Sequence, residues 1–151
     1  MTLSLVMILF FGCSNQVRVT GKVTFEDGTP LTEGKVVFDK DASFQAVGQI
    51  QDDGSYILGS YQLADGIPRG TYKVYITGAV SAETKNVGTR VQTGDQTFER
   101  GQTSIPMFTK LIHAKYETPE TSGLVCEVKK SMKYDIKVEP PEAAAEMRGR
   151  R

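Results

Sequence analysis

The stretch Val17–Phe38, VRVTGKVTFEDGTPLTEGKVVF, decides the fold of this chain. Apolar and polar residues alternate from residue 17 to residue 25. The apolar face carries Val17, Val19, Gly21, Val23 and Phe25. A period of two in a segment rich in Val and Thr predicts a β-strand with one buried face.

Turn-forming residues follow that strand. Asp27-Gly28 readily adopts a positive φ, and Pro30 cannot extend a hydrogen-bonded ladder. A second strand is predicted at 35–39, entered through Gly34. We therefore expect the two strands to form an opening hairpin.

The same pattern of short alternating strands and Gly, Asp or Pro turns recurs downstream. The further predicted strands are 46–51, 56–58, 71–77, 124–129 and 132–139. An Asp52-Asp53-Gly54 turn separates the first two of them and predicts a second hairpin. The pattern favours an all-β fold, an antiparallel two-sheet sandwich of about seven strands.

Three segments lack that alternation. Residues 78–104 are polar, and their few apolar side chains follow no steady period, which predicts a long loop that is either functional or disordered. Residues 116–123 are expected to form a structured loop in which Gly123 allows a positive φ. Pro140-Pro141 ends the sheet, so 140–151 is predicted to be a flexible tail.

Composition narrows the class of protein. A chain of 151 residues is long enough for one domain with one sizeable core. The 18 Lys and Arg residues balance the 18 Asp and Glu residues, so no global field favours nucleic acid as a partner. Two cysteines are too few for a disulfide framework or a Cys-rich zinc site.

The N-terminus carries an apolar run, Leu3–Phe11, which is too short to cross a bilayer core of roughly 30 Å. Such a run followed by small residues is typical of a signal peptide, here residues 1–12. The stretch ending in Gly12-Cys13 resembles a bacterial lipoprotein signal, which implies that Cys13 is the lipid attachment site and that 13–16 form a tether. An ordinary secretory signal and a buried N-terminal strand are the alternatives.

Several segments together resemble one class of proteins, the planctomycete-type small lipoproteins with a carboxypeptidase-regulatory-like or transthyretin-like domain. The matching segments are VTGKV (19–23), DGTPL (27–31), GKVVF (34–38), DGSY (53–56), GIPRGTYKV (66–74), KY (115–116) and TSGL (121–124). The resemblance implies a transthyretin-like (prealbumin-like) Greek-key sandwich over 17–139, export and lipid anchoring. It implies no established ligand or activity.

The residues show no catalytic set, so we predict that the protein is not an enzyme and needs no cofactor. His113 is the only histidine, which excludes a His-Glu-x-x-His zinc site, and we expect it to be a solvated loop residue. A cluster of Asp39, Asp41, Asp52 and Asp53 is the alternative reading, as oxygen ligands for Ca²⁺. That reading requires the turns that carry them to meet.

Aromatic and thiol side chains supply the remaining candidates. Tyr75 and Tyr116, with Tyr61 and Phe44, could form an exposed platform for stacking on a polysaccharide, or could cover the edge of the core. Cys126 falls on the apolar face of its strand, which predicts an inert buried thiol. A disulfide with Cys13 is the competing interpretation.

These observations favour a non-enzymatic, lipid-anchored, extracytoplasmic binding or scaffolding module of the cell envelope. Its expected partners are the membrane, through the N-terminal lipid, and an envelope protein or polysaccharide, with no nucleic acid. Contacts are expected from the 78–104 segment and from the turns at the ends of the sandwich. Ser14 after the cysteine would fit sorting to the outer membrane if the Gram-negative rule applies. A carbohydrate- or calcium-binding envelope module is the alternative.

Overall fold

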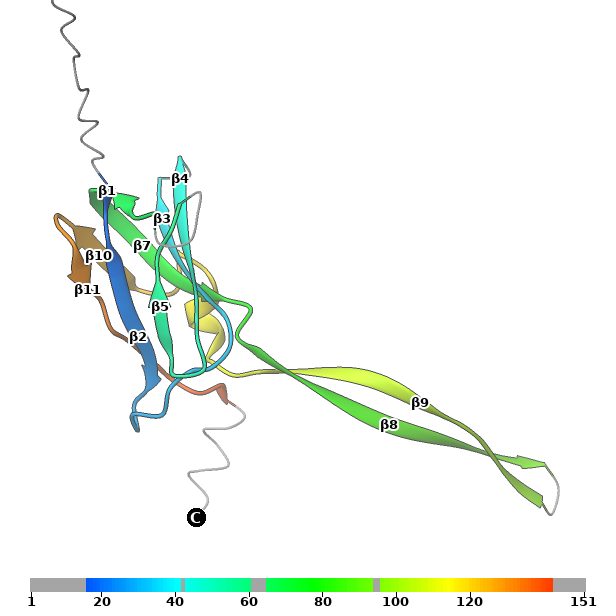
Figure 1. Cartoon of the computed structure of the whole chain (residues 1–151). Coiled ribbons are helices and arrows are strands. Elements are labelled where there is room, and N and C mark those ends of the chain that lie inside the picture. Colours follow the sequence, from blue (N-terminus) through cyan, green and yellow to red (C-terminus); the bar gives the residue numbers. More distant parts are fainter. Residues whose placement is uncertain (1–15, 42, 61–64, 94–95, 143–151) are drawn as a thin grey trace, which may run out of the picture.

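The computed structural model describes residues 16–41, 43–60, 65–93 and 96–142, with side chains omitted for 89–103 (Figure 1). The predicted signal peptide, Cys13 and the tail from residue 143 lie outside the described residues. The strands are β1 (Gln16–Val17), β2 (Val19–Phe25), β3 (Lys35–Lys40), β4 (Phe44–Gln49), β5 (Ser55–Ile57), β6 (Ile67–Pro68), β7 (Gly70–Thr77), β8 (Val80–Thr93), β9 (Gln96–Lys110), β10 (Leu124–Val128), β11 (Met132–Lys133) and β12 (Ile136–Val138). A short 3₁₀ helix, η1 (Ala114–Glu117), precedes β10. The predicted all-β class is confirmed.

The strands form two larger sheets and two strand pairs. One larger sheet has the order β10-β7-β3-β4 and is antiparallel throughout. The other is built on β2, which pairs antiparallel with β5 and parallel with β11 and β12. The pairs β1–β6 and β8–β9 are antiparallel. Two antiparallel sheets of about seven strands in all were expected; the additional strand pairs and the parallel pairing of β2 were not.

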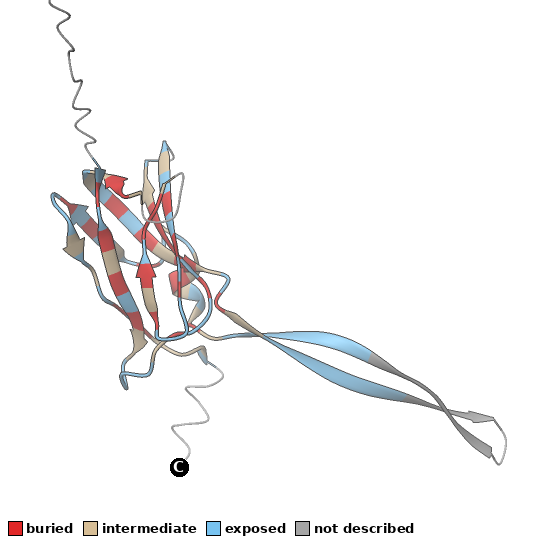
Figure 2. Cartoon of the chain, viewed as in Figure 1, coloured by how far each residue is buried: buried red, intermediate tan, exposed pale blue. Residues whose placement is uncertain are grey.

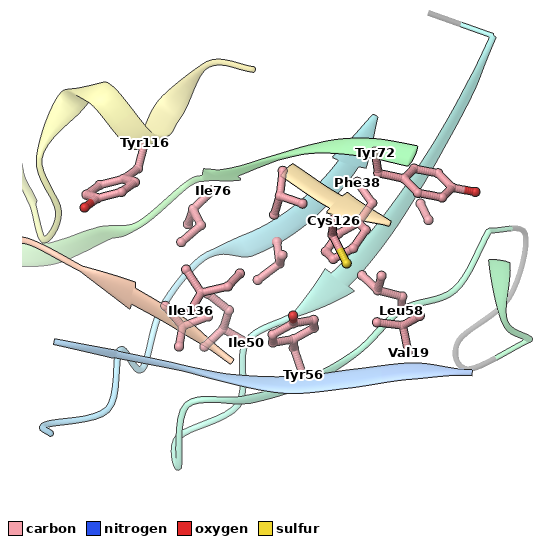
Figure 3. Packing of buried hydrophobic residues seen from close by; sticks show 14 of the residues in the cluster. Val19, Phe38, Ile50, Tyr56, Leu58, Tyr72, Ile76, Tyr116, Cys126 and Ile136 are labelled. Atoms are coloured by element: carbon pink, nitrogen blue, oxygen red, sulfur yellow. The ribbon is translucent and has the colours of Figure 1, made fainter. Parts of the chain in front are cut away.

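The apolar faces of the two larger sheets contribute to one hydrophobic core (Figure 3). Buried and exposed bands alternate along β2 and β7, as the period of two predicted (Figure 2). Val19 and Val23 are fully buried, and Ile136 and Val138 from β12 lie in the same cluster. The inward and outward faces predicted from the sequence are therefore confirmed for these strands.

The predicted opening hairpin is wrong, because β2 and β3 belong to different sheets. The turn itself folds back on β2: Phe25 N donates to Thr29 O at 2.8 Å, and Leu31 N donates to Val23 O at 3.0 Å. Leu31 is buried in the core at that point. The chain then crosses to the facing sheet, since an alternating strand buries one face equally well in either layer.

The turn of the second predicted hairpin is confirmed, but the predicted pairing of its two strands is wrong. Gly54 has φ +79°, and Gln51 N donates to Ser55 O at 2.8 Å. An isolated bridge joins Val47 to Gly59 further along. Between those points the strands separate, because β4 pairs with β3 whereas β5 pairs with β2.

The predicted strand 132–139 is interrupted between β11 and β12. Lys22 N donates to the Asp135 carboxylate at 2.9 Å, where a regular ladder would offer a backbone carbonyl. The Tyr134 carbonyl turns inward and accepts the Tyr56 hydroxyl at 2.6 Å. The side chain of Asp135 therefore replaces one rung of the ladder.

The prediction of a loop at 78–104 is wrong. Residues 80–93 and 96–110 form β8 and β9, a two-stranded ribbon that projects from the body (Figure 1). The described side chains of this ribbon form no core face, so these residues need no apolar alternation. The overlooked signal was Gly94-Asp95 between two runs that contain several Thr residues, a dipeptide typical of hairpin turns.

Candidate functional site

The most distinctive surface of the molecule is the ribbon formed by β8 and β9. Its described side chains are exposed at 82–88 and at 104–110 (Figure 2). One face carries Val87, Ile105 and Met107, because Glu83 lies opposite Met107 and Lys85 opposite Ile105 in the ladder. Phe108 lies on the other face and is 68% exposed. Exposed apolar side chains that lie together can form an interaction surface, so the ribbon is the first candidate for one.

The root of the ribbon is fixed in the core. Ala79 and Ile112, which flank the two strands, are both buried and belong to the core cluster. Leu111 N donates to Ala79 O at 3.0 Å, which extends the ladder by one rung. The core therefore sets the direction in which the ribbon leaves the body.

Two adjoining surface hollows lie beside this root and share Phe25, Asp27 and Pro140. The hollow toward the ribbon has a volume of about 340 Å³ and is also lined by Thr109 and Lys110. Its neighbour has a volume of about 480 Å³. The neighbour's further lining residues are Glu26, His113, Glu139 and Glu142.

Ion pairs connect the ribbon root, η1 and the end of β12. Lys110 Nζ lies 2.7 Å from a Glu117 carboxylate oxygen. Lys115 Nζ donates to Glu139 Oε1 at 2.6 Å, and this hydrogen bond lowers the pKa of Glu139 and raises the pKa of Lys115. Lys115 also lies over the ring of Tyr116, 5.0 Å from its centroid. These pairs are exposed, so they position the segment more than they stabilise it.

His113 is the N-cap of η1, where a solvated loop residue was predicted. Its Nδ1 accepts from Lys115 N at 3.1 Å, so the ring proton lies on Nε2. Nε2 can then donate to Glu142 Oε1, 3.1 Å away. Both ring nitrogens are therefore engaged in holding this segment together.

The predicted loop after η1 is confirmed as structural. Thr121 Oγ1 donates to the Lys115 carbonyl at 2.6 Å, and Ser122 N donates to the Thr118 carbonyl at 3.0 Å. Gly123 has φ +66°. These contacts join η1 to β10.

The structure does not bring the predicted aromatic residues together as an exposed platform. Tyr116 is 6% exposed and packs in the core from η1 (Figure 3), so of the two alternatives for it the exposed platform is wrong and cover of the core is correct. Phe44 packs against the core and contacts Tyr72 edge to face. Tyr61 lies outside the described residues. Tyr75 remains, half-buried on the outer face of β7.

A third hollow, of about 680 Å³, lies on the outer face of the sheet that carries Tyr75. Its lining includes Lys73, two residues before Tyr75 on the same face of β7, but not Tyr75 itself. Partial burial raises the pKa of the Tyr75 hydroxyl, and the nearby charges of Asp39 and Glu120 raise it further. Both carboxylates line the hollow. This face therefore combines one aromatic ring with charged groups.

The four aspartates considered for calcium do not share one loop cluster. Asp39 and Asp41 line the outer-face hollow, whereas Asp52 and Asp53 lie in the turn at the other end of β4. Asp53 accepts from Ser55 N at 2.9 Å and pairs with Lys22 at 3.2 Å. Over the described part of the chain, no group of three His, Cys, Asp or Glu residues could hold a metal ion.

Cys126 is a free thiol and is 2% exposed, which confirms its predicted burial. Burial raises its pKa, so the reactive thiolate is disfavoured.

Within the described ranges, no helix is both long and apolar enough to span a bilayer.

Comparisons with known proteins leave the function to be inferred from the chain itself. No family model and no curated protein sequence matches it. A solved structure of a DUF3823 family protein from Bacteroides ovatus ATCC 8483 is similar over 83% of this chain, with a TM-score of 0.41 and 17% sequence identity. The chain spans 45% of the length of that protein.

Proposed function

We propose that this chain is a non-enzymatic, lipid-anchored binding module of the cell envelope, and that it contacts its partners through the β8–β9 ribbon. In this proposal the two larger sheets are the layers of a transthyretin-like sandwich, attached to the membrane through Cys13. The module is extracytoplasmic, in the outer membrane if Gram-negative sorting rules apply. Its partners are envelope proteins rather than nucleic acid.

The exposed ribbon is the observation that carries the proposal. Its strands contain 14 and 15 residues, so it reaches roughly 45 Å at about 3.3 Å per residue. Two strands bury little of their own apolar surface, yet Phe108, Met107 and Ile105 are held in water by a root that is fixed in the core. A rigid body that presents a long exposed element is a common arrangement for binding.

The placement of β1 supports the membrane attachment. β1 begins at Gln16, three positions after Cys13, so an acylated Cys13 would hold this end of the body close to the bilayer. β1 pairs with β6 just before β7, and the ribbon begins just after β7. The eight residues of β7 therefore separate the two, and the ribbon leaves the body away from β1 (Figure 1).

Two measurements test the proposal. Mass spectrometry of the mature N-terminus should find acyl chains on Cys13, and Cys13→Ser should release the protein from the membrane fraction. An unmodified N-terminus on a membrane-free protein would refute the anchor.

The ribbon is tested by removing residues 82–108 and joining the remaining ends with a short Gly-Ser turn. Circular dichroism should show a folded body, because the ribbon contributes no residue between Val80 and Lys110 to the described core. Crosslinking in intact cells should lose the partners seen with the full chain. Retained partners would show that the contacts lie elsewhere.

Polysaccharide binding at the outer-face hollow is the second candidate, and Tyr75 favours it. A ring beside charged groups can stack on a sugar while carboxylates accept its hydroxyl protons. Binding on a glycan array that is lost in Tyr75→Ala and kept in Tyr116→Phe would support this candidate. An array that stays silent with and without Ca²⁺ would count against it.

A further inference from the structure

The ribbon has two outer edges, and each could accept another strand. In the described part of the chain, β8 and β9 pair with each other and with no third strand. An isolated two-stranded ribbon is marginally stable in water, and the unpaired backbone of an edge strand attracts further strands. The identity of the added strand depends on which edge can receive it.

The hydrogen-bonding phase of the ladder decides which edge can receive another strand. Leu111 N donates to Ala79 O, and these two residues stand opposite each other in the register that continues into the ribbon. Hydrogen-bonded and non-hydrogen-bonded pairs alternate along an antiparallel ladder. The pair Thr84–Pro106 is therefore a non-hydrogen-bonded pair, so the backbone groups of both residues point outward.

The two outer edges are consequently unequal. Pro106 has no N–H, so it interrupts the row of outward donors on β9. On β8 the outward groups belong to Ala82, Thr84 and Asn86, and none of these residues lacks a donor. The β8 edge is thus open to strand addition, whereas the β9 edge is protected.

We propose that a second copy of this chain occupies the β8 edge, paired antiparallel about a twofold axis at Thr84. In that register Glu83 stands opposite Lys85 of the second copy, and Lys85 stands opposite its Glu83. Thr84 faces its own counterpart. Opposite charges directly across an antiparallel pair are favourable, and the symmetry provides this pair twice.

Charge is what selects this register and this partner. An axis one residue earlier would place Glu83 against Glu83, and an axis one residue later would place Lys85 against Lys85, both unfavourable. The twofold register also closes the assembly. The four-stranded sheet ends on both sides in a β9 edge blocked by Pro106, which favours a dimer over a fibre.

The inference rests on the proposed binding role of the ribbon, and it names the partner. A shared lipid anchor would confine both copies to one membrane surface and so raise their effective concentration. The dimer itself does not depend on the anchor. It can therefore be tested in a full chain that carries Cys13→Ser.

Charge reversal is the first test, read by sedimentation of the Cys13→Ser chain. Glu83→Lys alone and Lys85→Glu alone each replace two attractive pairs with two repulsive pairs, which should raise the dimer Kd about tenfold or more. The double variant Glu83→Lys/Lys85→Glu restores both pairs and should restore the Kd. Equal Kd values for all four proteins, or a monomer at every concentration, would overturn the proposal.

A disulfide tests the register directly. In the twofold register the two copies of Thr84 have Cα atoms about 5.5 Å apart, which is within the range for a disulfide. Thr84→Cys should therefore give a crosslinked dimer on a non-reducing gel. Ser81→Cys is the matched control, because the two copies of Ser81 would lie roughly 20 Å apart and should not crosslink.

The outcomes also separate this inference from the proposed function. A monomer whose ribbon still captures an envelope protein would overturn the dimer and leave the binding role intact. A dimer that persists after removal of 82–108 would overturn the ribbon interface. The natural chain could also prove to carry no lipid while the dimer still shows the predicted response to charge reversal. That result would uphold the dimer and refute only the lipid anchor.

Discussion

Replacing Gly21 with alanine should destabilise the fold severely, because the backbone of the 131–138 segment passes directly over this residue. A Cβ at position 21 would lie 1.9 Å from the Tyr134 carbonyl oxygen and 2.8 Å from the Tyr56 hydroxyl. Real Cβ contacts are not shorter than 3.0 Å, so the backbone at Tyr134 must retreat by about 1 Å or more. A backbone atom cannot avoid the clash by changing rotamer.

That retreat affects the hydrogen bonds around the same point. Tyr134 N donates to Thr20 O at 2.8 Å, and the buried Tyr56 hydroxyl donates to the Tyr134 carbonyl at 2.6 Å. Overpacking costs about 1–3 kcal/mol, and an unsatisfied buried hydroxyl costs about 1–3 kcal/mol more. We expect a loss of about 2–6 kcal/mol in the free energy of unfolding, a large part of a typical total.

Urea unfolding at neutral pH measures this loss. Gly88→Ala is the control, because its added Cβ meets nothing within 4 Å and its φ is not positive, so a change below about 0.5 kcal/mol is expected. Tyr56→Phe alone should cost about 1–2 kcal/mol. It should cost less in the Gly21→Ala background, where the hydrogen bond is already broken. A Gly21→Ala loss as small as that of Gly88→Ala would refute the reasoning.

Three further predictions concern pH, the core and the ribbon root. Hydrogen bonds from Ser55 lower the pKa of Asp53 from 3.8 to about 2. The ionised Asp53 therefore contributes to the stability of the fold fully above pH 4, and this contribution is lost as the pH falls through 2. Asp53→Asn should remove that part of the pH dependence of the urea midpoint, and an unchanged slope would contradict it. Cys126→Ser buries a hydroxyl and should cost about 1–3 kcal/mol, with native Cys126 slow to react with a thiol reagent. Ile112→Ala should cost about 2–5 kcal/mol in the buried root, whereas Ile105→Ala, 47% exposed, should cost less than about 0.5 kcal/mol by the same assay.

The sequence predicted which side chains face inward, because a strand's period of two depends on the local chain alone. Val19, Val23, Ile136 and Cys126 were all assigned correctly to buried faces. Turn chemistry is equally local, which explains why the turn at Gly54 was placed correctly while its strands were assigned to the wrong partners. Pairing joins residues far apart in the chain, and apolar alternation carries no information about which sheet will receive a strand.

The ribbon is the segment whose strands the hydrophobic pattern did not predict. The described side chains of its strands form no buried face, so no hydrophobic period marks them, and the Thr-rich composition suits a loop as well as an exposed strand. The difference between their two edges follows from the ladder phase at Ala79, which decides that the missing N–H of Pro106 lies on the outer edge of β9, and this phase is a property of the folded chain. The sequence by itself determined the all-β class and the inward-facing residues through local stereochemistry. The tertiary structure alone decided the sheet partners, the burial of Tyr116 and the projecting ribbon, because these depend on contacts between distant segments.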